Sequence, residues 1–172
     1  KELKTVEWDA EAAEKAGYEH FMIKEIHEQP KAVSDTLNSV VKDGAIDLSE
    51  VGLSEEEIKE ISQIYIVACG SAYHVGVAAQ YVMEDLARIP VRVELASEFR
   101  YRNPILDPNG LVIIVSQSGE TADSLAALRE AKQNGIRTLG IVNVVGSSIA
   151  READNVFYTL AGPEISVATT KA

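Results

Sequence analysis

Five short apolar runs, separated by segments of helix length, occupy the chain from residue 64 to residue 160 and limit its fold more than any other feature. Val and Ile are nearly continuous in these runs, so we expect strands buried on both faces, as in a parallel sheet between two helix layers. The sequence therefore predicts an α/β fold: a doubly wound five-stranded parallel sheet with helices on both faces and the flavodoxin-like strand order 2-1-3-4-5. The runs are IYIVA (64–68), VRVELA (91–96), LVIIVS (111–116), TLGIVNV (138–144) and NVFYTL (155–160).

Residues 1–62 show no strand signal and predict a helical lead-in to this sheet domain, which we expect to span residues 63–172. Apolar residues recur at helical spacing in GYEHFMIKEIHEQPKAVSDTLNSVVKD, where Pro30 is expected to open the second of two helices. LSEEEIKEIS predicts a short helix capped by Ser54. Because the chain starts at a lysine and stops in VATTKA, where a further helix should begin, we expect both ends to be cut from a longer protein.

Composition argues against several classes of protein. The formal net charge of -11 disfavours a nucleic-acid partner, because binding a polyanion needs a lysine and arginine surface. No apolar run approaches the roughly 20 residues that cross a bilayer, so we expect no membrane association. The single cysteine, Cys69, excludes an internal disulfide and fits a cytoplasmic protein, and the three histidines lack metal-ligand spacing, so no metal site is predicted.

Two polar loops follow the first and third predicted strands, in CGSAYHVG and SQSGETADS. In the predicted strand order these strands flank the switch point of the winding, where ligands of doubly wound sheets bind. The second loop places Ser116, Gln117, Ser118 and Thr121 at the amino end of a helix. Hydroxyls, unpaired N–H groups and the positive end of the helix dipole suit a phosphate, so these residues are the candidate phosphate site.

Other interpretations of the same residues stay open from the sequence alone. The small polar residues could simply cap the helix, and Glu120 and Asp123 oppose an anion unless they point away from it. A P-loop is excluded because no lysine follows Gly119, and the dinucleotide fingerprint is absent after the first strand. Cys69 could be a nucleophile with His74 as its base, but a helix would carry His74 away from the loop, so a pocket-shaping role is favoured.

The motifs together resemble one family, the glutamine:fructose-6-phosphate aminotransferases, also called glucosamine-6-phosphate synthases. The resemblance runs collinearly over nearly the whole chain. It implies that this chain is the segment between the glutaminase and isomerase halves followed by the first sugar isomerase (SIS) domain of the isomerase half. The motifs are GYEHFMIKEIHEQP for the linking segment and IVACGSAYHVG, ELASEFRYRNP, SQSGETADSLAALREAK, NVVGSSIAREAD and AGPEISVATTKA for the domain.

The resemblance also implies substrate contacts residue by residue. Ser116, Gln117, Ser118 and Thr121 match the family's sugar-phosphate loop. The first loop, against the sugar, matches at Cys69, Gly70 and Ser71, and Val167 matches a position whose backbone approaches the substrate. The family often has a hydroxyl at the position of Ala72, so any hydrogen bond carried over to that position is not expected here.

By the same resemblance, this chain would be part of an enzyme that makes glucosamine 6-phosphate from fructose 6-phosphate and glutamine, in hexosamine biosynthesis. The glutaminase nucleophile would precede Lys1, and the isomerase acid, base and Schiff-base lysine would lie in a second SIS domain after Ala172. We therefore expect no catalytic residue and no cofactor here, an inactive fragment when alone, and a homodimeric parent. Its ligands would be fructose 6-phosphate and glucosamine 6-phosphate.

Two functions of other classes are alternatives to this enzyme. A non-catalytic SIS module that senses a sugar phosphate and regulates a partner would have no reason to carry HFMIKEIHEQP before it. A flavodoxin-like FMN carrier would need aromatic residues beside the ring, and the two loops offer Tyr73 alone. The chain is thus expected to bind a sugar phosphate.

Overall fold

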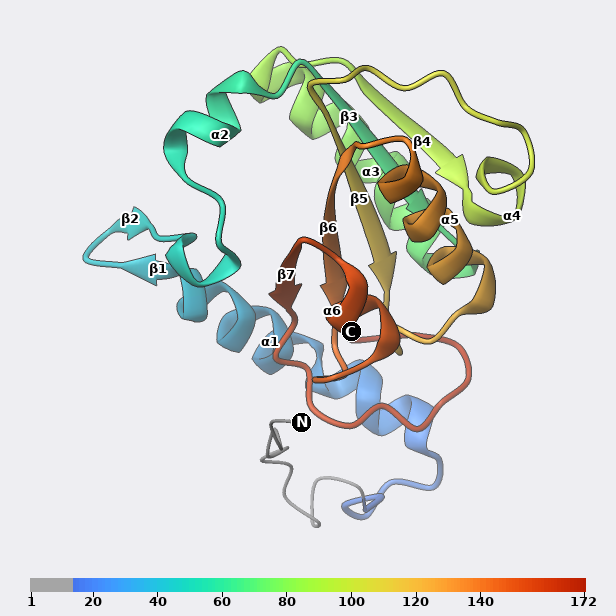
Figure 1. Cartoon of the computed structure of the whole chain (residues 1–172). Helices are drawn as coiled ribbons and strands as arrows, with labels where there is room; N and C mark the ends of the chain where they lie inside the picture. The colour runs from blue at the N-terminus through green and yellow to red at the C-terminus, as the bar shows by residue number, and fades with distance from the viewer. Residues whose placement is uncertain (1–13) are drawn as a thin grey trace. The chain divides into compact units, whose positions relative to one another are not determined.

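Five strands form the expected parallel sheet in the computed structural model, which describes residues 14–172. Their spatial order is β4-β3-β5-β6-β7, the predicted order 2-1-3-4-5 (Figure 1). The pairs β3–β4, β3–β5 and β5–β6 are parallel, so the carboxyl ends of these strands lie at one edge. The strands are β3 (Gln63–Ala68), β4 (Val91–Leu95), β5 (Gly110–Ser116), β6 (Arg137–Val142) and β7 (Asn155–Tyr158).

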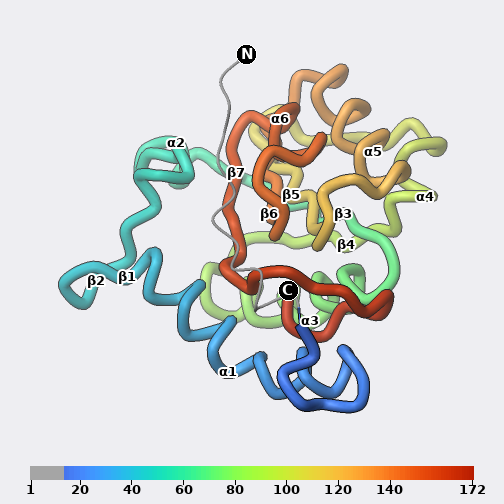
Figure 2. Tube along the Cα trace, turned by 90° about the horizontal axis from the view of Figure 1, so that it is seen from below, coloured from blue at the N-terminus to red at the C-terminus, as the bar shows by residue number. Residues whose placement is uncertain are grey.

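Helices cover both faces of this sheet, as predicted (Figure 2). The long helix α3 (Gly70–Ala87) lies on one face, and α4 (Ala96–Phe99), α5 (Ala122–Gln133) and α6 (Ser148–Glu152) lie on the other. Helix α3 approaches the strands closely because Gly76 has no side chain: a Cβ there would lie 2.8 Å from Ile66 Cγ2. The sheet therefore has the two buried faces that its Val- and Ile-rich strands require.

A short helix, α2 (Glu55–Glu60), precedes the sheet and has the predicted cap. Ser54 Oγ accepts a hydrogen bond from Glu57 N at 3.2 Å, and the Glu57 carboxylate accepts one from Ser54 N at 2.9 Å. This reciprocal pair is a capping box, which satisfies two of the amide groups left open at a helix start. The single turn η2 (Ser49–Val51) leads into it.

The helical lead-in differs from the prediction at Pro30. Pro30 does not open a second helix; it lies inside one continuous helix, α1 (Phe21–Val40). Contacts with residues 160–171 anchor α1 on both sides of the proline, through Glu25 before it and Thr36 after it. Packing against a common partner therefore outweighs the hydrogen bond that proline removes from the helix.

The lead-in also contains strands that the sequence reading missed. β1 (Val41–Lys42) and β2 (Ala45–Ile46) pair in antiparallel register around Asp43 and Gly44, whose φ angles are 52° and 79°. An Asp-Gly pair with two positive φ angles is the signature of a tight hairpin turn, and it was visible in VKDGAI. The strands themselves are too short to produce an alternating pattern.

By their internal contacts the described residues divide into two units. We call residues 48–157 the sheet unit and residues 14–47 with 158–172 the α1 unit. The domain boundary predicted between residues 62 and 63 stays a prediction. No helix within residues 14–172 is long and apolar enough to cross a membrane.

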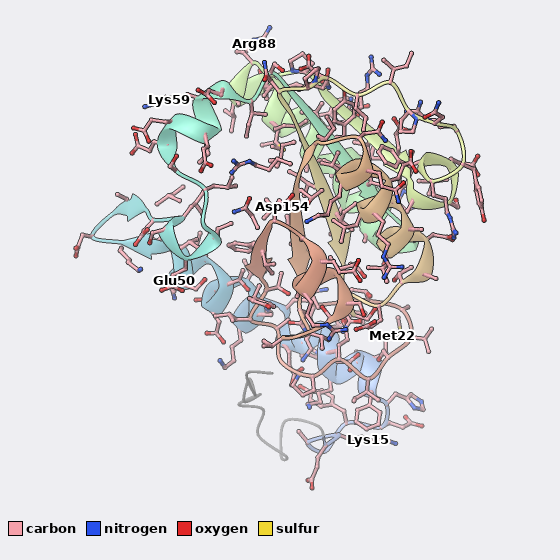
Figure 3. The ribbon with its side chains drawn as sticks, viewed as in Figure 1. Lys15, Met22, Glu50, Lys59, Arg88 and Asp154 are labelled. Atoms are coloured by element: carbon pink, nitrogen blue, oxygen red, sulfur yellow. The ribbon has the colours of Figure 1, made fainter. Side chains whose placement is uncertain are left out.

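Asp154 fixes the edge of the sheet where β6 and β7 begin (Figure 3). Its carboxylate accepts hydrogen bonds from Thr138 N at 3.0 Å and Thr138 Oγ1 at 2.7 Å, and it pairs with Lys132 Nζ at 2.5 Å. Burial acts to raise the pKa of Asp154, but the bonds from Lys132 and Thr138 outweigh it and lower this pKa below its usual value.

Two leucines of the sheet unit should differ clearly in how much they contribute to the free energy of unfolding. Leu128→Ala should lower the free energy of unfolding by about 2–5 kcal/mol, because the side chain is 0% exposed and its loss leaves a cavity. The same change at Leu86, which is 78% exposed, should cost less than about 0.5 kcal/mol. Urea unfolding followed by circular dichroism measures both, and equal costs would contradict the packing of α5 described here.

Candidate functional site

The two predicted loops meet at the carboxyl ends of the neighbouring strands β3 and β5. Cys69 follows β3 directly, and Ser124 lies in the first turn of α5, which follows β5. The Ser124 hydroxyl donates a hydrogen bond to Cys69 Sγ across 3.7 Å, although the residues are 55 positions apart. This contact joins the two loops at the predicted switch point. Ser124, only 1% exposed, was missed because nothing local marks it.

Two helices begin at this edge without a side-chain cap. The N-cap residues of α3 and α5 are Cys69 and Thr121, and neither side chain bonds to the first turn of its helix. Thr121 Oγ1 lies instead 3.3 Å from Ser116 Oγ. Simple capping therefore does not explain the hydroxyls of this loop, and the first-turn amides of two helices are left for another acceptor.

The serine hydroxyls of the loop are already oriented by its backbone. Ser116 Oγ accepts a hydrogen bond from Gly119 N at 3.1 Å, and Ser118 Oγ accepts one from Glu120 N at 3.2 Å. An oxygen that accepts in this way still carries a proton to donate. The loop therefore presents donors, which is the arrangement that an anion with only acceptor oxygens requires.

Both acidic residues beside the loop are engaged by other parts of the sheet unit. The side chain and the backbone N–H of Ser148 both donate to the Glu120 carboxylate, the N–H at 2.7 Å, and these bonds lower the pKa of Glu120. Asp123 Oδ1 accepts one from Arg100 Nη1 at 2.6 Å, and this bond raises the pKa of Arg100. The objection that these carboxylates would repel an anion is thereby reduced, because each one has its own donor.

The loop after β6 supports the candidate phosphate loop from the side. Asn143 N donates to Gln117 O at 3.1 Å, and Ile149 N donates to Gly119 O at 3.0 Å. Gly119 has a φ of 65°, and a Cβ there would lie 2.1 Å from Ser147 Oγ. Position 119 therefore requires glycine for its backbone angle and for its close approach. Asn143 and Ser147 have no signal in the sequence that would assign them this role.

The first loop places its predicted residues at the start of α3. Gly70 and Ser71 are exposed, and Cys69 is partly buried. The ring of His74 packs edge-on against Tyr73 at 5.4 Å, while the partner of Cys69 Sγ is Ser124. The geometry thus gives no support to a Cys69–His74 nucleophile and base.

Val167 lies in the α1 unit, in a segment without helix or strand, and it is fully exposed. Lys171, near it in sequence, has a side chain that is 3% exposed and pairs with Glu28 at 2.6 Å. Lys171 is therefore not a free amine.

A cavity of about 570 Å³ opens elsewhere on the sheet unit, beside the first residues of β6 and β7. Its two cations are paired, Lys132 with Asp154 and Arg137 with Glu57. It lies away from the carboxyl ends of the strands, where the polar loops are. Within residues 14–172 no cluster of His, Cys, Asp and Glu could hold a metal ion.

Comparison with known proteins gives a consistent set of matches. The SIS domain family model matches residues 57–172. The chain is 61% identical over 173 aligned residues to a glutamine–fructose-6-phosphate aminotransferase [isomerizing] of Clostridium acetobutylicum, covering all of this chain and 28% of that protein. A protein of the same name from Mycolicibacterium paratuberculosis is 57% identical over 96% of this chain and 27% of its own length.

Solved structures agree with these matches. The C-terminal domain of glucosamine-fructose-6-phosphate aminotransferase from Francisella tularensis superposes with a TM-score of 0.86 at 44% identity, over 92% of this chain and 45% of that one. Tagatose-6-phosphate ketose/aldose isomerase from Escherichia coli superposes at 0.69 with 18% identity, over 88% and 41%, which shows a shared fold alone. The chain spans about 28% of the length of the curated relatives first matched.

Gly119→Ala should lower the stability of the protein by more than the strain of a positive φ angle alone. Gly119→Ala places a Cβ on Ser147, whereas Gly135, with a φ of 73°, has nothing within 4 Å of such an atom. We expect Gly135→Ala to cost about 1–2 kcal/mol from strain, and Gly119→Ala about 1–3 kcal/mol more from overpacking. Thermal and urea unfolding measure the difference, and equal costs would contradict the contact with Ser147.

The Glu120 contact predicts a pH dependence. Because its folded-state pKa is lowered by the Ser148 hydrogen bonds, Glu120 stabilises the fold fully above its unfolded pKa, and this contribution is lost as pH falls through the folded pKa. The stability difference between the wild type and Glu120→Gln should therefore be greatest near pH 7 and shrink toward pH 3. Urea unfolding at several pH values measures this difference. A difference that stays constant with pH would contradict the Ser148 bond.

Proposed function

The chain belongs to the SIS domain family, and from this premise we propose that it binds a sugar phosphate, fructose 6-phosphate or glucosamine 6-phosphate, at the carboxyl ends of β3 and β5. The phosphate is assigned to Ser116, Gln117, Ser118 and Thr121. The observation that carries the proposal is that backbone N–H groups of the loop donate to Ser116 Oγ and Ser118 Oγ, so each of these hydroxyls still has a proton to donate. Two helix amino ends add amides and positive potential.

The sugar itself is assigned to the remaining predicted residues. Cys69, Gly70 and Ser71 lie on the loop that the Ser124 contact joins to the phosphate loop. Val167, which lies in the α1 unit, stays a prediction from the resemblance. With alanine at position 72, this chain offers one hydroxyl fewer than many relatives of the resembled family, so the sugar makes no hydrogen bond to that side chain.

In this proposal the phosphate loop orients the sugar phosphate. Binding energy from a phosphate remote from the reacting carbons fixes the sugar in place, and it lowers the barrier only when the catalytic groups are present. In the parent enzyme, ammonia would be delivered to the C2 carbonyl of open-chain fructose 6-phosphate, and a proton would then move between C1 and C2 to give the aldose. The loop takes no part in these proton transfers.

We further propose that the parent is a glutamine:fructose-6-phosphate aminotransferase and that this chain supplies its first SIS domain. This proposal is supported by the identity of 61% to a relative so named and by the TM-score of 0.86 with a domain of another. The partners would be a glutaminase domain and a second SIS domain, in a cytoplasmic homodimer. The catalytic acid, base and lysine would belong to the second SIS domain, so this chain alone binds the sugar phosphate and does not convert it.

Titration calorimetry of the chain tests the binding directly. We expect fructose 6-phosphate to bind and unphosphorylated fructose not to bind. Ser118→Ala and Thr121→Ala should each weaken fructose 6-phosphate about 10- to 100-fold, because each removes a donor to a charged group. Ser39→Ala, an exposed serine on α1, is the matched control and should leave the affinity unchanged.

Two results would contradict the proposal. Equal binding of fructose and fructose 6-phosphate would show that the loop does not bind the phosphate. Unchanged affinity in both loop variants would show that these hydroxyls do not contact the ligand. Robust isomerisation of fructose 6-phosphate by the chain alone would contradict the assignment of the catalytic groups to another domain.

A further inference from the structure

The candidate phosphate loop has no cation of its own. Residues 116–128 include Glu120 and Asp123 but no lysine or arginine. A carboxylate in the first turn of a helix is favoured by the helix dipole, but it repels a second anion that binds at the same helix end. Glu120 accepts hydrogen bonds from Ser148, whereas Asp123 lies in the first turn of α5 itself. Binding of a phosphate to this loop is therefore favoured by a positive charge that another part of the sheet unit brings to Asp123.

Arg100 brings that charge from a third loop at the same edge of the sheet. It follows α4, which begins directly after β4, and β4 pairs in parallel with β3. Helices α4 and α5 lie side by side on one face of the sheet (Figure 1). Arg100 Nη1 donates a hydrogen bond to Asp123 Oδ1 at 2.6 Å, across 23 positions of the sequence. The segments after three adjacent strands, β4, β3 and β5, therefore meet around the candidate site.

The guanidinium of Arg100 is held in place by its surroundings. The preceding residue, Phe99, is 0% exposed and anchors α4 in the core of the sheet unit. The guanidinium also lies over the ring of Tyr101, with 4.6 Å between Arg100 Cζ and the ring centroid. The side chain of Arg100 is 30% exposed, and a partly buried ion pair is screened by salt less than a fully exposed one. The positive charge of Arg100 therefore stays beside Asp123.

We propose that Arg100 is a positioning residue that sets the affinity of the candidate phosphate loop for anions. Its guanidinium holds the Asp123 carboxylate and balances its charge, so the amino end of α5 keeps a positive potential toward the ligand. Arg100 acts through Asp123 in this proposal and does not need to touch the ligand. The inference rests on the proposed function, and it assigns part of the binding of phosphate to a residue outside both predicted loops.

A second ion pair on the same helix supplies the matched control. Arg129 donates two hydrogen bonds to the carboxylate of Glu152, at 2.7 Å and 2.6 Å. At a rise of about 1.5 Å per residue, Arg129 lies about 12 Å along α5 from Thr121, beyond the Debye length of about 8 Å at physiological ionic strength. Substitutions in this pair change the net charge of the protein as those at Arg100 and Asp123 do, but away from the loop.

Titrations of the chain with fructose 6-phosphate and with inorganic phosphate, followed by NMR, test the role of this charge. Arg100→Gln should weaken both ligands about 3- to 10-fold, because it leaves the Asp123 carboxylate unbalanced. Asp123→Asn keeps an acceptor oxygen and removes the charge, so it should tighten both ligands about 2- to 5-fold. The double variant should bind within about twofold of the wild type. Arg129→Gln and Glu152→Gln should leave both affinities unchanged.

The dependence on salt separates an effect of charge from a distortion of the loop. The differences among the variants should shrink as the NaCl concentration rises from about 20 mM to about 500 mM, because screening weakens the repulsion by Asp123. If Arg100→Gln does not fold, Asp123→Asn still gives the comparison with the wild type.

Several results would overturn this inference alone: unchanged affinities in Arg100→Gln and Asp123→Asn, a double variant as weak as Arg100→Gln, or equal effects from the Arg129 pair. A wild type that binds no fructose 6-phosphate would overturn the proposed function with it.

Discussion

The hydrogen bonds from the loop after β6 and the start of α6 to the loop after β5 hold the candidate site in shape. A turn built from Ser, Gln and Gly has little apolar surface to bury, so its conformation must be set by polar contacts. Gln117 O and Gly119 O accept from the neighbouring loop, and Glu120 reaches Ser148 N. With the outer side of the turn fixed in this way, the hydroxyls on its inner side keep one orientation. A binding loop that is already ordered loses less entropy when the ligand arrives.

The sheet could be predicted from the sequence because each strand has its own local run of apolar residues. Buried parallel strands need Val and Ile on both faces, and the five runs show this locally, so the order 2-1-3-4-5 could be expected and was confirmed. The structure differs from the prediction at Pro30 because packing along α1 outweighs the local preference of proline, and at Asp43-Gly44 because strands of two residues show no periodicity. Local patterns therefore predict elements that are stabilised locally.

The candidate site was predictable only in part, for the same physical reason. Ser116, Ser118 and Thr121 lie together in one short motif, so their gathering at a helix start follows from the chain itself. Ser124 contacts a cysteine 55 positions away, and Arg100 reaches Asp123 across 23 positions. Such pairs depend on how the sheet is assembled. The spacing of residues along the chain does not indicate such pairs, and only a structure can reveal them.

An anion site in a chain with a formal charge of -11 needs its nearby carboxylates to be occupied elsewhere. Asp123 is held by Arg100, and Glu120 by a backbone amide. The charge of each carboxylate is partly balanced by the N–H groups that donate to it. Carboxylates that would repel a phosphate if they faced it are therefore engaged in holding the candidate loop, which is why acidic residues so close to the proposed site do not argue against an anionic ligand.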